Sequence, residues 1–280
     1  MATIIVHGGA GDWPKERWAQ ASEGCVMAAQ AGHSVLLQSG SALDAVEQAV
    51  VLLEDEPLFN AGRGAHLTKA GHVEMDALIC DGAELNFGAV AAVRNVGNPI
   101  NVARMVMELT DHCMLAGQGA TTFAHAHGVP FCTDDELFGS RLPPTLGDTV
   151  GAVALDDDGS IAAATSTGGT REKHPGRVGD SPIFGCGGFA DDLCGISATG
   201  DGEALMRVTF ASSVAAAIRA GATLEDSVNR VLGTMQSRLN GTGGAIVLNR
   251  DGSCAASWTT AFMPWASIDA TGQLTSNAAH

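Results

Sequence analysis

The sequence of 280 residues predicts a mixed α+β fold, because β-hairpins alternate with amphipathic helices along the chain. Three pairs of β-compatible segments are each joined by a short turn rich in Asp, Asn or Gly. These pairs cover residues 75–80 with 87–93, 149–155 with 161–164, and 245–248 with 254–258. Helical patterns precede the first hairpin and lie between successive hairpins, so both kinds of element contribute to the fold.

Start and stop signals place the helices. Ser41 and Asp44 form the pattern of a capping box, and the helix that follows is expected to end near Glu54. Other helices are expected from near Pro14, from Pro99, over residues 114–127, over 203–220 as one long helix, and from Thr223. A buried strand is expected at residues 3–6, before a glycine loop at 7–11.

One irregular segment divides this pattern. Residues 128–148 are rich in Pro, Gly and acidic residues, and we interpret them as a linker. Thr149 follows at once and begins the central hairpin. The hairpin leads into glycine-rich bends at 165–169, 176–180 and 199–202, which carry hydroxyl groups, Arg177 and Asp180.

Composition excludes several classes of partner. The net charge is −16 with only 15 Lys and Arg, which argues against nucleic acid and against an anionic membrane surface. Seven scattered cysteines form no C-x-x-C pair and are typical of reduced thiols in a cytoplasmic protein. The N-terminal residues lack the pattern of a secretory signal, and no window approaches eighteen uninterrupted apolar residues.

Thr149 is a candidate nucleophile because of its position at the boundary of linker and strand. A threonine hydroxyl needs a base to take its proton, and the sequence around Thr149 offers no obvious His or Lys partner. Cleavage of the chain after Asp148 would free the α-amino group of Thr149 to act as that base, with Asp148 assisting the cleavage. On propensity alone, a threonine that begins a strand is more often simply a β-former.

Other residues that could belong to a functional site also have a purely structural interpretation. His7 could be catalytic, although a lone His at a strand end is more often structural. The glycine loop that follows it lacks the G-x-G-x-x-G spacing of a phosphate site. Arg177 and Asp180, taken alone, are best interpreted as an ion pair that they form with each other.

Seven short blocks together resemble the plant-type asparaginase and isoaspartyl peptidase family of N-terminal nucleophile hydrolases. In chain order they are HGGAG (7–11), LFNAG (58–62), MDA (75–77), DTVGAVALD (148–156), TSTGG (165–169), PGRVGDSP (175–182) and TGDGE (199–203). The blocks span nearly the whole chain, and those around Thr149 to Asp180 are the most specific.

The resemblance implies a four-layer αββα sandwich formed by a single domain of residues 1–280. It also implies autocatalytic cleavage between Asp148 and Thr149, which yields an α fragment (1–148) and a β fragment (149–280). The mature enzyme is then expected to be a dimer of αβ units, a heterotetramer. Two departures stand out: the linker is short for the family, and residues 257–263 lack an expected glycine-containing sequence, which bears on substrate preference.

The catalytic roles that the resemblance implies fall on four residues. Thr149 would be the nucleophile, and Thr167 would lie beside its amino and hydroxyl groups. The Thr199 hydroxyl and the Gly200 backbone N–H would form the oxyanion hole. This last role is physically reasonable, because donors on a glycine bend at a helix N-terminus are well placed to stabilise developing negative charge.

Substrate binding would fall on a second group. Arg177 and Asp180 would bind the α-carboxylate and α-ammonium groups, helped by the Gly202 carbonyl, and Asn60 resembles the active-site asparagine of the family. No cofactor is expected for catalysis. A structural sodium ion would be held by the backbone carbonyls of a loop, namely those of Leu53, Glu54, Glu56, Phe59, Ala61 and Arg63.

The expected activity is therefore hydrolysis of L-asparagine, of isoaspartyl (β-aspartyl) dipeptides, or of both, through a β-aspartyl–Thr149 intermediate. The partner is thus a small-molecule substrate. Two relatives with the same chemistry, glycosylasparaginase and threonine aspartase, remain alternatives. A non-catalytic small-molecule binding protein is the alternative from a different class.

Overall fold

The computed structural model describes residues 2–138 and 149–277, whose strands form two sheets. The larger sheet has the strand order β12-β11-β1-β5-β6-β2-β3-β4, and the smaller has the order β10-β9-β8-β7. The strands are β1 (Thr3–His7), β2 (Met75–Asp81), β3 (Asn86–Val93), β4 (Met114–Ala116), β5 (Val150–Leu155), β6 (Ile161–Thr167), β7 (Gly188–Ala190), β8 (Cys194–Gly200), β9 (Gly243–Asn249), β10 (Cys254–Trp258), β11 (Trp265–Ile268) and β12 (Leu274–Ser276).

Helices cover the outer faces of both sheets. The bounds of the α-helices are α1 (Trp18–Leu37), α2 (Ala42–Asp55), α3 (Pro99–Leu109), α4 (Gly117–Ala126), α5 (Asp134–Phe138), α6 (Gly202–Arg207), α7 (Phe210–Arg219) and α8 (Leu224–Leu239). Two short 3₁₀ turns, η1 (Lys15–Arg17) and η2 (Gly62–Gly64), complete the described helical elements. In this part of the chain, no helix has the length and apolar character needed to cross a membrane.

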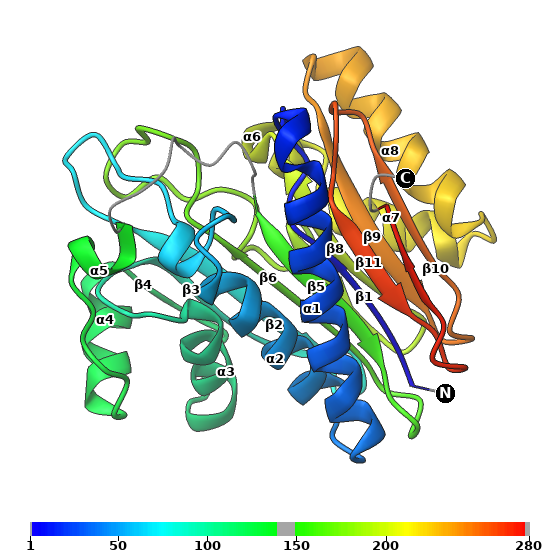
Figure 1. The fold of residues 1–280 in the computed structure, drawn as a ribbon, viewed down its shortest axis with the longest axis horizontal. Helices are drawn as coiled ribbons and strands as arrows, with labels where there is room; N and C mark the ends of the chain where they lie inside the picture. The colour runs from blue at the N-terminus through cyan, green and yellow to red at the C-terminus, as the bar shows by residue number, and fades with distance from the viewer. Residues whose placement is uncertain (1, 139–148, 278–280) are drawn as a thin grey trace.

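The elements stack in four layers, with helices outside and sheets inside (Figure 1). One hydrophobic cluster lies between α1–α3 and the larger sheet, and includes Val46 and Leu53. A second lies between the sheets, where Val153 and Ile246 meet. A third lies between the smaller sheet and α7–α8, around Phe210. The predicted four-layer αββα sandwich is confirmed.

The central hairpin lies at the middle of this stack. β5 pairs with β1 on one side and with β6 on the other, and every residue of β5 and β6 is buried. Both faces are covered because α2 packs on one side and β8 of the smaller sheet on the other. The strands consist mostly of Ala, Gly, Val, Ser and Thr, which lets the layers approach closely. The N-terminus of β5, where Thr149 stands, is thus held from several directions.

Several sequence predictions need correction. The single helix expected at 203–220 is two helices, α6 and α7, separated at Thr209, whose φ of +44° is left-handed. The stretch 114–127 begins with strand β4 before helix α4. The linker is not wholly irregular, because α5 lies within it and Asp134 contacts His72 and Arg94. Asp148 and the rest of the linker from residue 139 lie outside the described residues.

Candidate active site

Thr149 lies at the start of β5 and is 2% exposed. β5 and β6 pair antiparallel with Val150 opposite Ser166, and one further step of that register places Thr149 opposite Thr167. The Thr149 Oγ1 atom lies 3.2 Å from the Ser181 Oγ atom. The Thr167 hydroxyl accepts a hydrogen bond of 2.9 Å from the Gly169 N–H. The Ser181 hydroxyl therefore contacts the predicted nucleophile, and Ser181 was not among the predicted site residues.

Thr199 and Gly200 end strand β8, on the smaller sheet. The Thr199 Oγ1 atom accepts a hydrogen bond of 3.1 Å from the Ala10 N–H, in the glycine loop after β1. Its own proton remains available to a further acceptor. Gly200 has a φ of +132°, and a Cβ there would lie 2.4 Å from the Gly243 Cα and 2.5 Å from the Thr242 carbonyl oxygen. Only glycine fits this bend without displacing β9.

Asn60 forms hydrogen bonds with the backbone of the bend after β6. Its Nδ2 donates to the Gly169 carbonyl at 2.8 Å, and its backbone carbonyl accepts from the Gly168 N–H at 2.8 Å. Its Oδ1 accepts from the His66 N–H at 3.0 Å. The observed contacts of Asn60 are therefore with backbone groups, and they hold the Gly168–Gly169 bend beside Thr167.

Arg177 makes a bidentate ion pair that was not predicted. Its Nε and Nη2 donate to the two carboxylate oxygens of Glu203 at 3.0 and 2.7 Å. Burial alone would lower the Arg177 pKa, but the hydrogen bonds and charge of Glu203, with the charges of Asp76 and Asp180, raise it. The guanidinium is thus positively charged at any physiological pH.

Gly202 is the point where Arg177 and Asp180 come together. A Cβ on Gly202 would lie 2.9 Å from the Arg177 Nη2 and 2.9 Å from the Asp180 Oδ1. The cationic and anionic groups therefore approach the same small space, with no side chain on Gly202 to fill it. Opposite charges so arranged suit the carboxylate and ammonium groups of an amino acid.

A buried charge pair lies behind this group. Lys173 is 4% exposed, and its Nζ donates to the Glu74 carbonyl at 2.6 Å. Burial lowers its pKa, opposed by the charges of Asp76 and Glu74. Burial raises the pKa of Asp76, opposed first by the charge of Lys173. Asp76 stands opposite Thr167 in the β2–β6 pairing, so this pair borders the predicted site.

His7 belongs to a buried chain of hydrogen bonds between the sheets. Thr165 donates to the Gly187 carbonyl at 3.2 Å, and the Ser197 Oγ atom lies 2.8 Å from the Thr165 Oγ1 atom and 2.9 Å from the His7 Nε2 atom. Burial lowers the His7 pKa to about 3, although a hydrogen bond with the Thr149 backbone opposes this shift. His7 is therefore neutral near pH 7 and packs against the residues of the site.

The predicted sodium loop has a backbone that suits a cation. α2 ends at Asp55, so carbonyls of its last turn, including those of Leu53 and Glu54, lie at the negative end of the helix dipole. Gly62, with a φ of +52°, approaches the Glu54 carbonyl so closely that a Cβ would lie 2.4 Å from its oxygen. Clustered carbonyl oxygens are ligands that hard cations prefer. The residues present fit the predicted ion.

The divergent segment at 257–263 lies close to the Gly200 bend. Thr259 exchanges hydrogen bonds with Gly243, the residue that pairs with Gly200 across β8 and β9. Phe262 forms a bridge with Gly11 and stacks on Trp18, with ring centroids 4.4 Å apart. The segment thus joins the glycine loop to the smaller sheet near the predicted oxyanion hole.

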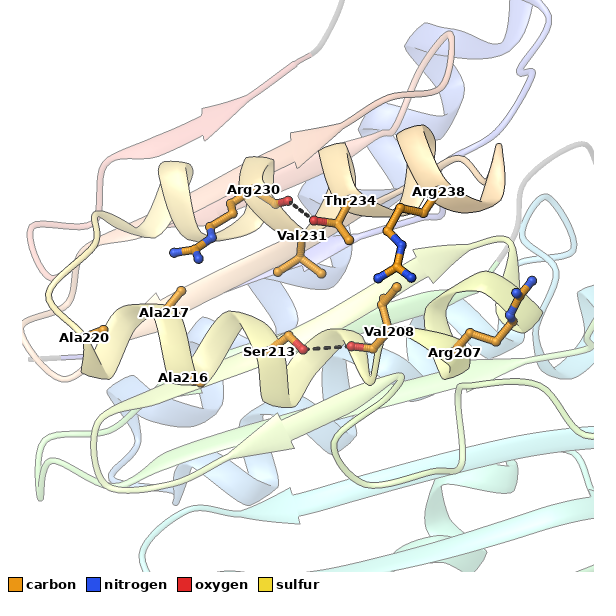
Figure 2. Close-up of a pocket in the computed structure, with 10 residues that line it drawn as sticks. All are labelled: Arg207, Val208, Ser213, Ala216, Ala217, Ala220, Arg230, Val231, Thr234 and Arg238. Atoms are coloured by element: carbon orange, nitrogen blue, oxygen red, sulfur yellow. Dashed lines mark hydrogen bonds between the residues drawn. The ribbon is translucent and has the colours of Figure 1, made fainter.

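A groove of about 550 Å³ lies elsewhere, between α7 and α8 near the end of α6 (Figure 2). Figure 2 shows Arg207, Arg230 and Arg238 around its rim. Of the predicted site residues that the structure describes, none lines this groove. The groove is therefore not the site that holds Thr149.

The described residues thus include a buried threonine hydroxyl in contact with Ser181, a glycine bend at Gly200, and a cationic and an anionic group that approach Gly202. Such an arrangement can support nucleophilic attack on a carbonyl of a zwitterionic substrate. The sequence indicated most of these positions through the resemblance of its short blocks to a known family. It gave no signal for the burial of Lys173 and Asp76, nor for the contact of Arg177 with Glu203, because both depend on how distant segments pack.

Comparison with known proteins gives a consistent result. A family model described as Asparaginase matches residues 1–145 and 140–276. A human protein named isoaspartyl peptidase/L-asparaginase is 47% identical over 283 residues, covering 94% of this chain and 92% of its own length. A bovine protein of the same name is 45% identical with the same coverage. An Arabidopsis thaliana protein, named probable isoaspartyl peptidase/L-asparaginase 2, is 39% identical over 82% of this chain and 84% of its own.

Proposed function

Since the chain belongs to the asparaginase family, we propose that it hydrolyses L-asparagine and isoaspartyl dipeptides, releasing L-aspartate from both. The relatives' names support both substrates, which share the same aspartyl half. The main support for the proposal is that the nucleophile contacts a residue adjacent in sequence to one of the charged groups that would bind the substrate. Ser181, which contacts the Thr149 hydroxyl, directly follows Asp180, and Asp180 and Arg177 approach Gly202 together.

In the proposed reaction, the Thr149 Oγ attacks the side-chain carbonyl carbon of the substrate. Ammonia or the amino acid half of the dipeptide leaves, and a β-aspartyl ester remains on Thr149. Water then hydrolyses the ester, which releases L-aspartate and restores the hydroxyl. The Thr199 hydroxyl and the Gly200 N–H would stabilise the negative charge that develops on the carbonyl oxygen.

The base in this scheme is the α-amino group of Thr149, freed by autocatalytic cleavage after Asp148. An α-amine has an unperturbed pKa of about 7.7 to 8.0, so a modest decrease leaves it largely neutral near pH 7. The free amine and the hydroxyl belong to the same residue, which keeps the proton transfer short. Thr167, opposite Thr149 in the sheet register, would orient both groups.

Three further features complete the proposal. The mature enzyme would be a dimer of αβ units, a heterotetramer formed from the fragments 1–148 and 149–280. A structural sodium ion would be held by the carbonyls after α2, which the approach of Gly62 to the Glu54 carbonyl supports. A cytoplasmic location is supported by the seven cysteines, all of which are free thiols.

The activity is tested by measuring L-aspartate release from L-asparagine and from β-aspartyl dipeptides, with the Thr149→Ala protein as control. We expect release from both substrates by the wild-type protein and none above background by the variant. Release from a glycosylated asparagine alone would assign the chain to the glycosylasparaginase activity instead. Binding of L-aspartate without any turnover by the cleaved protein would indicate a binding protein.

A further inference from the structure

The contact between Arg177 and Glu203 uses one particular edge of the guanidinium. The carboxylate of Glu203 takes the edge formed by Nε and Nη2, at 3.0 and 2.7 Å. The guanidinium is planar and has a second edge, formed by Nη1 and Nη2, which can bind another carboxylate. Occupation of the first edge by Glu203 therefore leaves the second edge available.

Glycines border the Nη1/Nη2 side of the guanidinium. A Cβ on Gly179 would lie 2.8 Å from Nη1, and a Cβ on Gly169 would lie 3.4 Å from the same atom. A Cβ on Gly202 would lie 2.9 Å from Nη2 and equally far from the Asp180 Oδ1. Each of these glycines adjoins the predicted site, since Gly169 binds Thr167 and Gly202 follows Gly200 by two residues. On this side, the residues closest to the guanidinium are therefore glycines near the predicted site, which carry no side chain that could bind it.

The two side chains of the ion pair differ in their exposure to solvent. The Arg177 side chain is 16% exposed, whereas that of Glu203 is 58% exposed. Glu203 therefore lies on the solvent side of the guanidinium, and the substrate space lies on its inner side. Glu203 also stands in the first turn of α6, directly after Gly202, so its position is tied to that of the glycine bend.

We propose that Glu203 is a positioning residue, which orients the Arg177 guanidinium so that its Nη1/Nη2 edge binds the α-carboxylate of the substrate. This inference rests on the proposed function for the identity of that carboxylate. A long arginine side chain otherwise samples many rotamers, and the bidentate contact removes this freedom before substrate arrives. Glu203 acts through Arg177 and does not itself touch the substrate.

The test compares Glu203→Gln with the matched control Glu225→Gln. Glu225 is also an exposed acid in the first turn of a helix, α8, so the control reproduces the loss of charge at a helix N-terminus. L-aspartate binding is measured by calorimetry, which needs no turnover. We expect Glu203→Gln to weaken binding about tenfold, the scale of one charge-assisted contact, and Glu225→Gln to leave it unchanged.

Two further measurements distinguish a positioning role of Glu203 from a general loss of stability: steady-state kinetics, and the same substitution in a protein that already carries Arg177→Lys. With L-asparagine, Glu203→Gln should raise KM by a similar factor while kcat stays within about twofold, since ground-state and transition-state binding lose equally. In an Arg177→Lys protein, which lacks the two-edged guanidinium, the same change at Glu203 should have little further effect on L-aspartate binding.

Either of two results would overturn the inference. Unchanged L-aspartate affinity in Glu203→Gln would mean that the ion pair does not orient Arg177. Tighter binding would mean that Glu203 competes with the substrate for the guanidinium. Failure of the wild-type protein to hydrolyse asparagine would instead count against the proposed function, and the binding measurement would still decide the role of Glu203.

Discussion

The hydroxyl oxygens of Thr149 and Ser181 lie 3.2 Å apart, although the residues are separated by the β5–β6 hairpin and the Arg177 bend. Ser181 is 1% exposed, so this contact is shielded from water. The contact fixes the direction of the predicted nucleophile and connects it to Asp180, the next residue along the chain. It links the two halves of the proposed site.

Removal of the Ser181 hydroxyl should slow the chemistry without weakening substrate binding. In Ser181→Ala, Thr149 loses a hydrogen bond worth about 1 kcal/mol, and we expect kcat for L-asparagine to fall by roughly three- to tenfold. KM should stay within about twofold. Steady-state kinetics provide the measurement, and an unchanged kcat would show that the contact does not orient the nucleophile.

Thr199 offers a test of the predicted oxyanion hole. Thr199→Val keeps the shape of the side chain but removes the hydroxyl, which accepts from Ala10 and would donate to the substrate. We expect kcat to fall by about 10²- to 10³-fold, the usual cost of losing one oxyanion donor. Thr199→Ser retains the hydroxyl and serves as the control. Equal loss in both variants would assign Thr199 a packing role only.

Gly200 should tolerate no side chain. In Gly200→Ala, the methyl group would lie 2.4 Å from the Gly243 Cα, so β8 or β9 must shift and the Gly200 N–H with it. We expect activity to be lost and the thermal midpoint to fall. Gly221→Ala is the control, because Gly221 also has a positive φ, of +91°, but a Cβ there meets nothing within 4 Å. Similar loss of activity in both would exclude a steric cause at Gly200.

The lowered pKa of His7 predicts how the free energy of unfolding of the protein depends on pH. Burial lowers its pKa in the folded protein to about 3, from the ordinary value of 6.5. As pH falls from about 6.5 towards 3, the unfolded chain binds a proton that the folded protein does not, so the free energy of unfolding decreases.

The comparison variant is His7→Gln, whose amide can donate to Ser197 but does not titrate. The stability advantage of the wild type over this variant should shrink on acidification from pH 7 to pH 4, by an amount on the order of a few kcal/mol. Denaturant unfolding at several pH values measures it. An advantage that stays constant over this range would contradict a buried, neutral His7.

Local signals in the sequence were enough to predict much of the fold. The capping box of Ser41 and Asp44 is present in the structure, and all three predicted hairpins form. The separation of α6 from α7 at Thr209 had no local signal, because no glycine or proline marks it. Strand β11 was missed because its pairing with β1, such as Ile268 with Ile4, joins opposite ends of the chain.

The same distinction applies to the candidate site. The roles of Thr149, Thr167, Thr199 and Gly200 were predicted from the resemblance of the short blocks to a known family, since local patterns alone did not assign them. Glu203 lies within the block TGDGE (199–203), yet its contact with Arg177 joins residues 26 positions apart and depends on how α6 packs. A lysine such as Lys173 is usually exposed, so its burial beside Asp76 follows only from the stacking of the sheets.

The central claim is that the chain cleaves itself to free the amino group of Thr149, and intact mass tests this most directly. The purified wild-type protein and Thr149→Ala are incubated under folding conditions and then weighed by mass spectrometry. We predict that the wild type separates into fragments 1–148 and 149–280, the second beginning with Thr149, while the variant stays whole. A wild-type protein that is folded, hydrolyses asparagine and yet remains a single chain of 280 residues would contradict the proposed mechanism.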